Sequence, residues 1–264
     1  MKKFIAKGRT ADVYQISENK ILKLYIENYD EKSILNEFEI SKFVFKKELP
    51  VPQPFEIVSD NNRKGIIFQY IKGNTMLKKF SEEPLKIQKN ARIFAKIQKS
   101  INEISAENIS QHKIFLEKNI INNKSLENNL KEKILKHLYN LNDDKKLCHG
   151  DYHPDNLIVS DKQIFVIDWL NSVSGNPASD VARTTLLIKF GSLPEGTSKI
   201  SGFIINKIRN IFYNTYIKEY LNNSLITKSD INKWLLPNSV ARLNENIPAE
   251  EKENILNYIK SFKI

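Results

Sequence analysis

The pattern of apolar residues changes near residue 73, and this change constrains the fold more than any other feature of the 264-residue sequence. Within residues 1–72, short apolar or alternating segments rich in β-branched and aromatic residues predict five antiparallel strands. Helical spacing at about residues 30–47 places one helix between the third and fourth strands. From about residue 82 onward most segments have helical spacing. The sequence therefore predicts an α+β chain with two lobes, residues 1–72 and a larger, mainly helical lobe of residues 73–264.

Basic residues outnumber acidic ones, but their placement does not favour a nucleic-acid partner. The chain has 41 Lys and Arg against 31 Asp and Glu, a formal net charge of +10, and eight of these ten charges fall within residues 1–100. The basic residues are interleaved with Asn, Ile and Glu and form no run longer than a pair. No helix-turn-helix, zinc-finger or RNP-like motif accompanies them. We therefore expect a solvated basic surface and no nucleic-acid partner.

Composition also indicates the compartment. Hydrophobic residues make up 41% of the chain, enough for a buried core, yet no window approaches the roughly 18 apolar residues of a membrane span. The first ten residues contain an apolar run of only three, too short for a signal peptide. Cys148 is the single cysteine, which excludes an intramolecular disulfide and a cysteine-based zinc site. We expect a cytoplasmic protein without a membrane partner.

The segment CHGDYHPDNLIV, followed by VIDW, carries the strongest chemical signal. It places Asp151, Asn156 and Asp168 on a loop and a predicted hairpin. Phosphoryl transfer needs a carboxylate that accepts or orients the proton of the acceptor hydroxyl, and hard oxygen ligands that hold Mg²⁺ on the nucleotide phosphates. One asparagine and two aspartates supply both kinds of group.

These segments resemble those of a known family. HGDxxxxN followed by IDW is similar to the catalytic and metal-binding segments of the aminoglycoside phosphotransferase and choline kinase-like family, which has a protein-kinase-like fold. GNPASDVA, at residues 175–182, resembles a third segment of that family. The resemblance implies that Asp151 is the catalytic base and that Asn156 and Asp168 bind Mg²⁺. It also implies that His149 and Asp180 support the catalytic loop.

The same resemblance requires a lysine on the third strand and a helix glutamate that holds it. Lys23 lies in the otherwise apolar segment ILKLYI, where a lysine is costly unless it is paired. An edge-strand lysine that faces solvent is the alternative. Glu37 and Glu39 are both candidate partners, and Glu37 is favoured because it borders the apolar helix face, whereas Glu39 has Lys42 three positions later.

The nucleotide loop is less distinctive. GRTADVY contains only Gly8, so Thr10 either faces the phosphates or belongs to a simple hairpin turn. The segment IIFQYIKG resembles the family's connection between the lobes, where the backbone of Gln69 and Ile71 would bond the purine. Because these contacts are made by the main chain, the side chains specify little, and the choice between ATP and GTP stays open.

The predicted function is therefore an ATP- or GTP-dependent, Mg²⁺-requiring kinase that phosphorylates a hydroxyl group of a small molecule. Aminoglycosides are polycations, so their pocket should be rich in carboxylates. Residues 227–264 contain six basic and five acidic residues, which disfavours an aminoglycoside without excluding it. Amino alcohols and sugars stay open as acceptors. The alternative prediction is a catalytically silent pseudokinase that binds a nucleotide.

Overall fold

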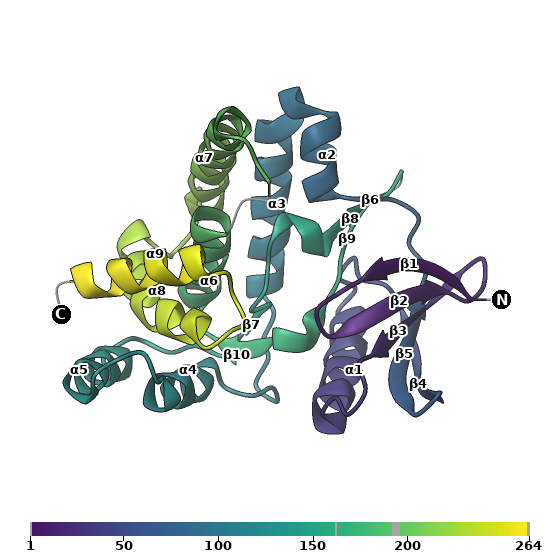
Figure 1. Cartoon of the computed structure of the whole chain (residues 1–264), viewed down its shortest axis with the longest axis horizontal. Coiled ribbons are helices and arrows are strands. Elements are labelled where there is room, and N and C mark those ends of the chain that lie inside the picture. Colours follow the sequence, from purple (N-terminus) through teal and green to yellow (C-terminus); the bar gives the residue numbers. More distant parts are fainter. Residues whose placement is uncertain (1, 162, 192–195, 263–264) are drawn as a thin grey trace. The chain divides into compact units, whose positions relative to one another are not determined.

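The computed structural model describes residues 2–161, 163–191 and 196–262 (Figure 1). They form two compact units, each built from two separate stretches of chain. The first unit comprises the residues up to Glu82 together with Pro154–Ser172, and the second comprises the remainder. The sequence-based division differs, because it places each lobe on one continuous stretch, residues 1–72 and 73–264. That the first lobe binds the nucleotide and the second the acceptor stays a prediction.

The first unit contains the predicted five-stranded antiparallel sheet. Its strands lie in the order β1-β2-β3-β5-β4. Their bounds are β1 (Lys3–Lys7), β2 (Ala11–Gln15), β3 (Lys20–Tyr25), β4 (Pro54–Asp60) and β5 (Arg63–Gln69). The helix α1 (Glu31–Lys46) connects β3 to β4 and is capped at its N-terminus by Asp30, whose side chain accepts a hydrogen bond from the Ser33 N–H. The predicted strand and helix order of this region is confirmed.

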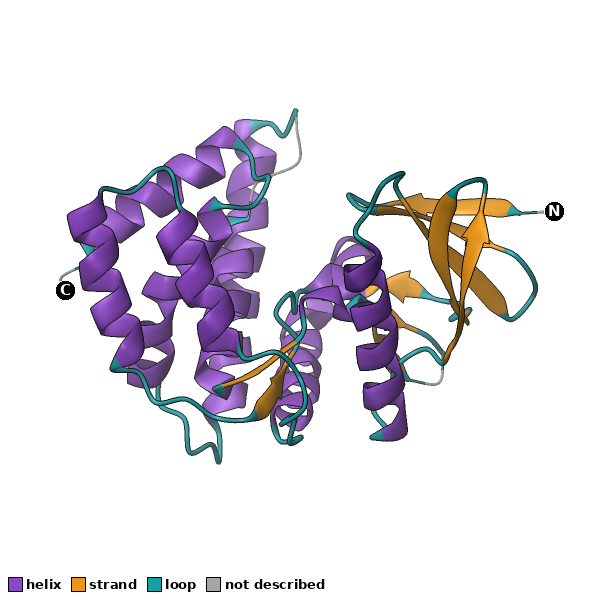
Figure 2. Cartoon of the chain, turned by 90° about the horizontal axis from the view of Figure 1, so that it is seen from below, coloured by secondary structure: helices purple, strands orange, loops and turns teal. Residues whose placement is uncertain are grey.

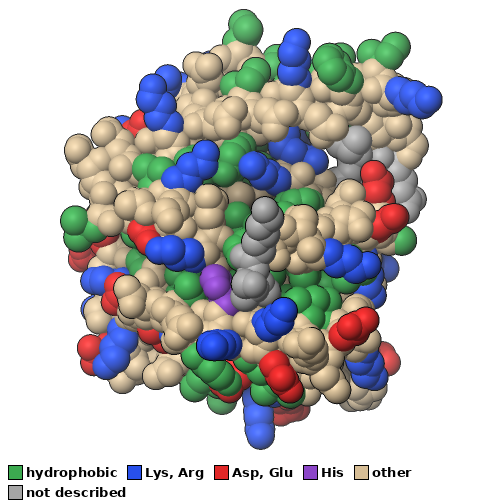
Figure 3. Space-filling view, turned by 90° about the vertical axis from the view of Figure 1, so that its left-hand side faces the viewer, with side chains coloured by type: hydrophobic (Ala, Val, Ile, Leu, Met, Phe, Trp, Pro, Cys, Tyr) green, Lys and Arg blue, Asp and Glu red, His purple; other side chains and the backbone are tan. Residues whose placement is uncertain are grey.

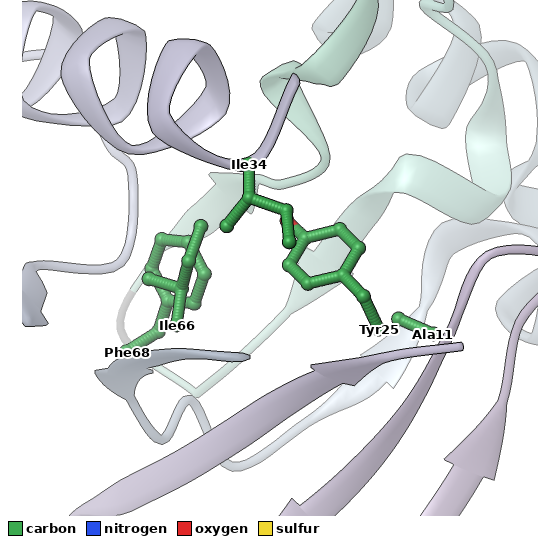
Figure 4. Close-up of a cluster of buried hydrophobic side chains, with 5 residues drawn as sticks. All are labelled: Ala11, Tyr25, Ile34, Ile66 and Phe68. Carbon is green, nitrogen blue, oxygen red and sulfur yellow. The ribbon is translucent and has the colours of Figure 1, made fainter. Parts of the chain in front are cut away.

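Apolar side chains join α1 to the sheet. Ile34 on α1 points toward the buried residues of the strands (Figure 4). These are Ala11 on β2, Tyr25 on β3, and Ile66 and Phe68 on β5. The other buried residues of α1 are Glu37, Ile40, Ser41 and Val44.

The first unit also contains a hairpin from later in the chain. The strands β8 (Leu157–Val159) and β9 (Ile164–Val166) pair with each other, and β6 (Asn74–Thr75) pairs with β8. The helix α2 (Met76–Glu82) follows β6. The hairpin was predicted, whereas β6 and α2 were not. A strand of two residues has no detectable alternation, and α2 has only seven residues.

The second unit is mainly helical, as predicted (Figure 2). Its longer helices are α3 (Ile87–Asn102), α4 (His112–Asn122), α5 (Asn128–Tyr139), α6 (Pro177–Phe190), α7 (Lys199–Leu221), α8 (Lys228–Leu243) and α9 (Ala249–Ser261). A two-stranded antiparallel sheet of β7 (Lys146–Cys148) and β10 (Val173–Gly175) leads into the loop that carries Asp151. Within the described part of the chain, no helix has the length and apolar character needed to cross a membrane.

Lysine and arginine side chains are spread over one face of the molecule, with Asp and Glu side chains among them (Figure 3). They do not gather in a single basic field on this face. This distribution agrees with the solvated surface expected from the interleaved charges of the sequence.

Candidate active site

Lys23 lies at the centre of a charged cluster in the first unit. Its Nζ atom is 2.6 Å from Oε1 of Glu37 on α1 and 2.8 Å from Oδ1 of Asp168, just after the β8–β9 hairpin. The hydroxyl of Tyr25 donates a second hydrogen bond to Glu37. Glu39, the other candidate partner, contacts Lys42 instead.

The position of β3 explains why Lys23 is paired. This strand is the middle strand of the five, so its third and fourth residues have neighbours on both sides. The side chain of Lys23 is 14% exposed and that of Glu37 is 2% exposed. The alternative of an edge-strand lysine facing solvent is therefore wrong.

Burial and charge act in opposite directions within this cluster. Burial by itself would lower the pKa of Lys23, but the carboxylates of Glu37 and Asp168 raise it above its ordinary value. Burial raises the pKa of Glu37, and the Lys23 ammonium opposes that rise. Lys23 therefore stays positively charged at neutral pH and can bind an anionic group.

The backbone brings Asn156 and Asp168 close together in the first unit. The Ile167 N–H donates a 3.0 Å hydrogen bond to the carbonyl of Asn156, so Asp168 follows directly after a residue fixed to Asn156. Asp168 adopts a left-handed backbone conformation with φ of 65°, and its side chain is 41% exposed. An amide oxygen and an accessible carboxylate are suitable ligands for Mg²⁺.

Those two residues would not enclose a metal ion by themselves. Among the described residues, no group of three or more His, Cys, Asp or Glu is arranged to hold a metal. Mg²⁺ commonly binds through one or two protein oxygens while substrate phosphates supply further ligands. The donors at Asn156 and Asp168 fit that kind of shared site.

The catalytic loop predicted from the sequence lies in the second unit. The Gly150 N–H donates a 2.9 Å hydrogen bond to Oδ1 of Asp180, which is fully buried at the start of α6. The other oxygen of Asp180 accepts hydrogen bonds from Gln98 and Asn102 on α3. His149 is also buried. The structure therefore places both predicted supporting residues inside the unit, with Asp180 bonded to the loop.

Asp151 is surrounded by basic groups. Its carboxylate lies 3.5 Å from Nε2 of His153 and 3.7 Å from a terminal nitrogen of Arg183. Burial would raise the pKa of Asp151, but His153, Arg183 and His149 together lower it well below the ordinary value. Asp151 is therefore an ionised carboxylate at neutral pH, the form that accepts a proton.

Arg183 was not identified from the sequence. It lies one helical turn after Asp180 on α6, so that spacing was an available signal. Its Nε donates a 3.1 Å hydrogen bond to the Gly150 carbonyl, and it contacts Glu245 at 2.7 Å. Glu245 lies beyond the end of α8, and nothing in the sequence connects it to the loop.

Besides Lys23 and Glu37, the three other residues expected near the nucleotide lie in the first unit. Thr10 lies in the turn between β1 and β2, and its carbonyl accepts a 2.9 Å hydrogen bond from the Ile26 N–H. The Gln69 N–H at the end of β5 donates to the Gln53 carbonyl at 2.8 Å. Ile71 is buried two residues later. Their roles toward a nucleotide stay predictions.

Two other side chains of reactive type, Cys148 and His112, are buried outside both clusters. Cys148 is buried, and burial raises the pKa of its thiol well above the ordinary value, so it is not a reactive thiolate. His112, the first residue of α4, is buried with its ring stacked on Trp234 of α8, and burial lowers its pKa to about 4. Neither residue fits a catalytic role.

The sequence matches a family model described as the phosphotransferase enzyme family over residues 3–196. A curated relative, acyl-CoA dehydrogenase family member 11 from Pongo abelii, is 36% identical over 83 residues. That match includes 27% of this chain and 11% of the relative's length. It therefore concerns a single segment of a much longer protein.

Solved structures are similar over nearly the whole chain. The streptomycin-ATP-APH(2")-IIa ternary complex is 17% identical, with a TM-score of 0.63 and coverage of 100% of this chain and 92% of that chain. A choline/ethanolamine kinase family protein from Mesorhizobium loti is 12% identical, with a TM-score of 0.63 and coverage of 99% and 87%. A thermostable mutant of aminoglycoside phosphotransferase APH(4)-Ia, in a ternary complex with AMP-PNP and hygromycin B, is 12% identical, with a TM-score of 0.67 and coverage of 98% and 92%. At these identities the likeness concerns the fold, and it confirms the predicted protein-kinase-like α+β architecture.

Proposed function

Because the chain belongs to the phosphotransferase enzyme family, we propose that it transfers the γ-phosphoryl group of ATP or GTP to a hydroxyl group of a small molecule. Family membership confirms the broader class, a phosphotransferase. That the acceptor is a small molecule is part of the proposal, and solved structures with this fold that bind or act on small molecules support it. The observation that carries the proposal is the cluster of Lys23, Glu37 and Asp168, which keeps one lysine charged beside an accessible carboxylate.

In the proposed reaction Lys23 binds nucleotide phosphate oxygens while Glu37 holds its side chain in place. The acceptor hydroxyl oxygen forms a bond to the γ-phosphorus, and the bond from that phosphorus to the β–γ bridging oxygen breaks, which releases the nucleoside diphosphate. Asp151 accepts the hydroxyl proton. Its lowered pKa keeps the carboxylate ionised before the reaction.

The cofactor in this proposal is Mg²⁺, held by Asn156 and Asp168 together with the nucleotide phosphates. When bound, the ion would neutralise phosphate charge. Thr10 would lie near the phosphates, and the backbone of Gln69 and Ile71 near the purine. The lobe of residues 1–72 would thus bind the nucleotide, and the lobe of residues 73–264 would carry the catalytic loop and bind the acceptor.

The acceptor belongs to the class of small hydroxyl compounds. The solved structures that share the fold include complexes with streptomycin and hygromycin B and a choline/ethanolamine kinase family protein. An aminoglycoside, an amino alcohol and a sugar are therefore the first acceptors to test. The near balance of charge in residues 227–264 places the uncharged or singly charged compounds ahead of the polycations.

A screen of these acceptors with release of ADP as the readout tests the proposal. Asp151→Asn should slow transfer about 10²–10⁴-fold, the usual contribution of a general base. Binding of Mg·ADP, measured by calorimetry, should be nearly unchanged. Wild-type rates in Asp151→Asn would show that Asp151 is not the base. Nucleotide binding with no turnover on any acceptor would instead favour the silent pseudokinase.

A further inference from the structure

Two residues of α6 hold the peptide groups on both sides of Gly150. Asp180 accepts a hydrogen bond from the Gly150 N–H at 2.9 Å, and Arg183 donates one from Nε to the Gly150 carbonyl at 3.1 Å. Asp180 and Arg183 are three positions apart and therefore lie on the same side of the helix. Gly150 has a φ of 76°, a left-handed conformation that residues with a side chain rarely adopt. The turn immediately before Asp151 is thus fixed at its donor and at its acceptor by one helix.

The guanidinium group of Arg183 also lies between two carboxylates. One terminal nitrogen is 2.7 Å from Oε1 of Glu245 and 3.7 Å from Oδ1 of Asp151. Its contact with Glu245 is therefore the shorter one, and its contact with Asp151 is longer than a hydrogen bond. The side chain of Arg183 is only 8% exposed, so its charge is little screened by water.

A second arginine holds Glu245 in place. Arg242, near the end of α8, contacts Glu245 at 2.5 Å and Glu251 on α9 at 2.7 Å. Arg242 and Glu251 are both buried. Arg183, Glu245, Arg242 and Glu251 therefore form a continuous series of ion pairs. Through this series α8 and α9, as well as α6, determine the position of Arg183.

We propose that Arg183 is a positioning residue for Asp151, and that Glu245 limits how strongly Arg183 acts on it. Arg183 orients the loop through the Gly150 carbonyl, and its charge lowers the affinity of the Asp151 carboxylate for a proton. Glu245 takes the short contact with Arg183, so that Asp151 keeps enough basicity to accept a proton. Only the catalytic consequence rests on the proposed function; the effect on the charge of Asp151 does not.

Other charged and titratable groups also act on Asp151. His153, two residues later in the loop, lies 3.5 Å away, and His149 lies two residues earlier. Both lower the pKa of Asp151, as Arg183 does, whereas burial raises it. A test of Arg183 must therefore leave both histidines in place.

The direct test is a pH titration of the Asp151 carboxyl carbon by ¹³C NMR in the full chain, with Asp151→Asn used to assign the resonance. In Arg183→Met the pKa of Asp151 should rise toward the ordinary aspartate value of about 3.9. In Glu245→Gln the pKa of Asp151 should fall further, because Arg183 is then free to move closer to Asp151; an unchanged pKa would overturn the role given to Glu245. Lys189→Met is the matched control, because it removes the same charge from the same helix. Lys189 lies over the ring of Tyr213 and is not among the groups that shift the pKa of Asp151.

Arg183→Lys separates the two effects. It keeps the positive charge but loses the planar group that reaches the Gly150 carbonyl and Glu245 together. We expect the pKa of Asp151 to stay low in this variant, while transfer to an identified acceptor falls through kcat with an unchanged KM for the nucleotide. Far-UV circular dichroism and Mg·ADP binding show that each variant is folded.

An Asp151 pKa in Arg183→Met equal to that of the wild type, in a folded protein, would overturn the proposal. A rise of the same size in Lys189→Met would overturn it too, because the effect would then come from net charge alone. The proposed function fails on a different result, namely nucleotide binding by the wild type without turnover on any acceptor. The two failures are therefore distinguishable.

Discussion

Replacing Lys23 by methionine should destabilise the first unit, and the loss should depend on pH. Lys23 contacts Glu37 at 2.6 Å and Asp168 at 2.8 Å. Methionine keeps an unbranched side chain but removes the charge. Asp168, which is 41% exposed, can then be solvated by water, whereas Glu37 stays buried with the hydrogen bond from Tyr25.

The size of the effect follows from the burial of Glu37. Removing one partner of a buried ion pair costs about 3–5 kcal/mol, because the other charge is left uncompensated. With the Glu37 side chain only 2% exposed, we expect Lys23→Met to lose stability in this range at pH 7. The reverse change, Glu37→Gln, should cost only about 1–2 kcal/mol, because Lys23 keeps Asp168 as a partner and the amide oxygen still accepts hydrogen bonds.

The dependence on pH distinguishes the two variants. Burial raises the pKa of Glu37, and without Lys23 nothing of comparable strength opposes the rise. A carboxyl group whose pKa is higher in the folded than in the unfolded state favours folding most at low pH, and this contribution is lost as the pH rises through the folded pKa. Lys23→Met should therefore become less stable from about pH 4 toward pH 7, relative to the wild type, and Glu37→Gln should not.

The two tryptophans make the measurement specific to one unit. Trp169 lies in the first unit and Trp234 in the second, and the chain contains no others. In a Trp234→Phe background, urea unfolding followed by tryptophan fluorescence reports the first unit alone. Each variant is measured in this background at several pH values between 4 and 7.

Glu39→Gln is the matched control, since it removes a carboxylate from the same helix. Glu39 and Lys42 form an exposed pair, so the change should cost less than about 0.5 kcal/mol at any pH in the range. Equal losses in Lys23→Met and Glu37→Gln, with no difference in their dependence on pH, would refute the reasoning from burial.

Two further predictions concern Asp168 and His112. Asp168→Asn should raise the Mg²⁺ concentration needed for half-maximal transfer, because it would remove a charged ligand. The control Asp161→Asn, in the nearby hairpin turn, should not raise it. Equal Mg²⁺ requirements in the two variants would contradict the proposal that Asp168 binds the ion. Burial lowers the pKa of His112 to about 4, so the unfolded chain binds a proton at this residue before the folded one does as the pH falls from about 6.5. The free energy of unfolding of the second unit should therefore fall by about 2–4 kcal/mol between pH 6.5 and 4. Urea unfolding in a Trp169→Phe background measures this loss, and His112→Gln should reduce it; an unchanged slope would exclude His112 as its source.

The sequence predicted best the features that depend on periodicity or on local motifs. The five strands, the helix between the third and fourth, and the helical second half all follow from apolar spacing. The choice of Glu37 over Glu39 also followed from spacing, because the residue nearer the apolar face is the one that can reach a buried lysine. The family was identified from the segments HGDxxxxN, IDW and GNPASDVA, whose residues have a fixed order in the family.

Other features could not be predicted because they depend on distant parts of the chain. The strands β6, β7 and β10 have two or three residues each, too few for a pattern, and they form only where a partner strand is already placed. Glu245 reaches Arg183 across 62 positions of sequence. Contacts of this kind follow from the packing of α6, α8 and α9 and not from any local signal.

In both clusters the carboxylate lies on irregular backbone, whereas the cation beside it lies on a regular strand or helix. Asp168 has a left-handed backbone conformation, and Asp151 directly follows a left-handed glycine. Their cations come from regular elements, Lys23 from the middle strand of a sheet and Arg183 from a helix. Loops can aim a carboxylate in directions that a strand or helix cannot, but they do not fix its position. A cation on a regular element that is itself held by a further contact supplies that position. We therefore expect the loops to lose their geometry when either cation is removed, even where the carboxylate itself is intact.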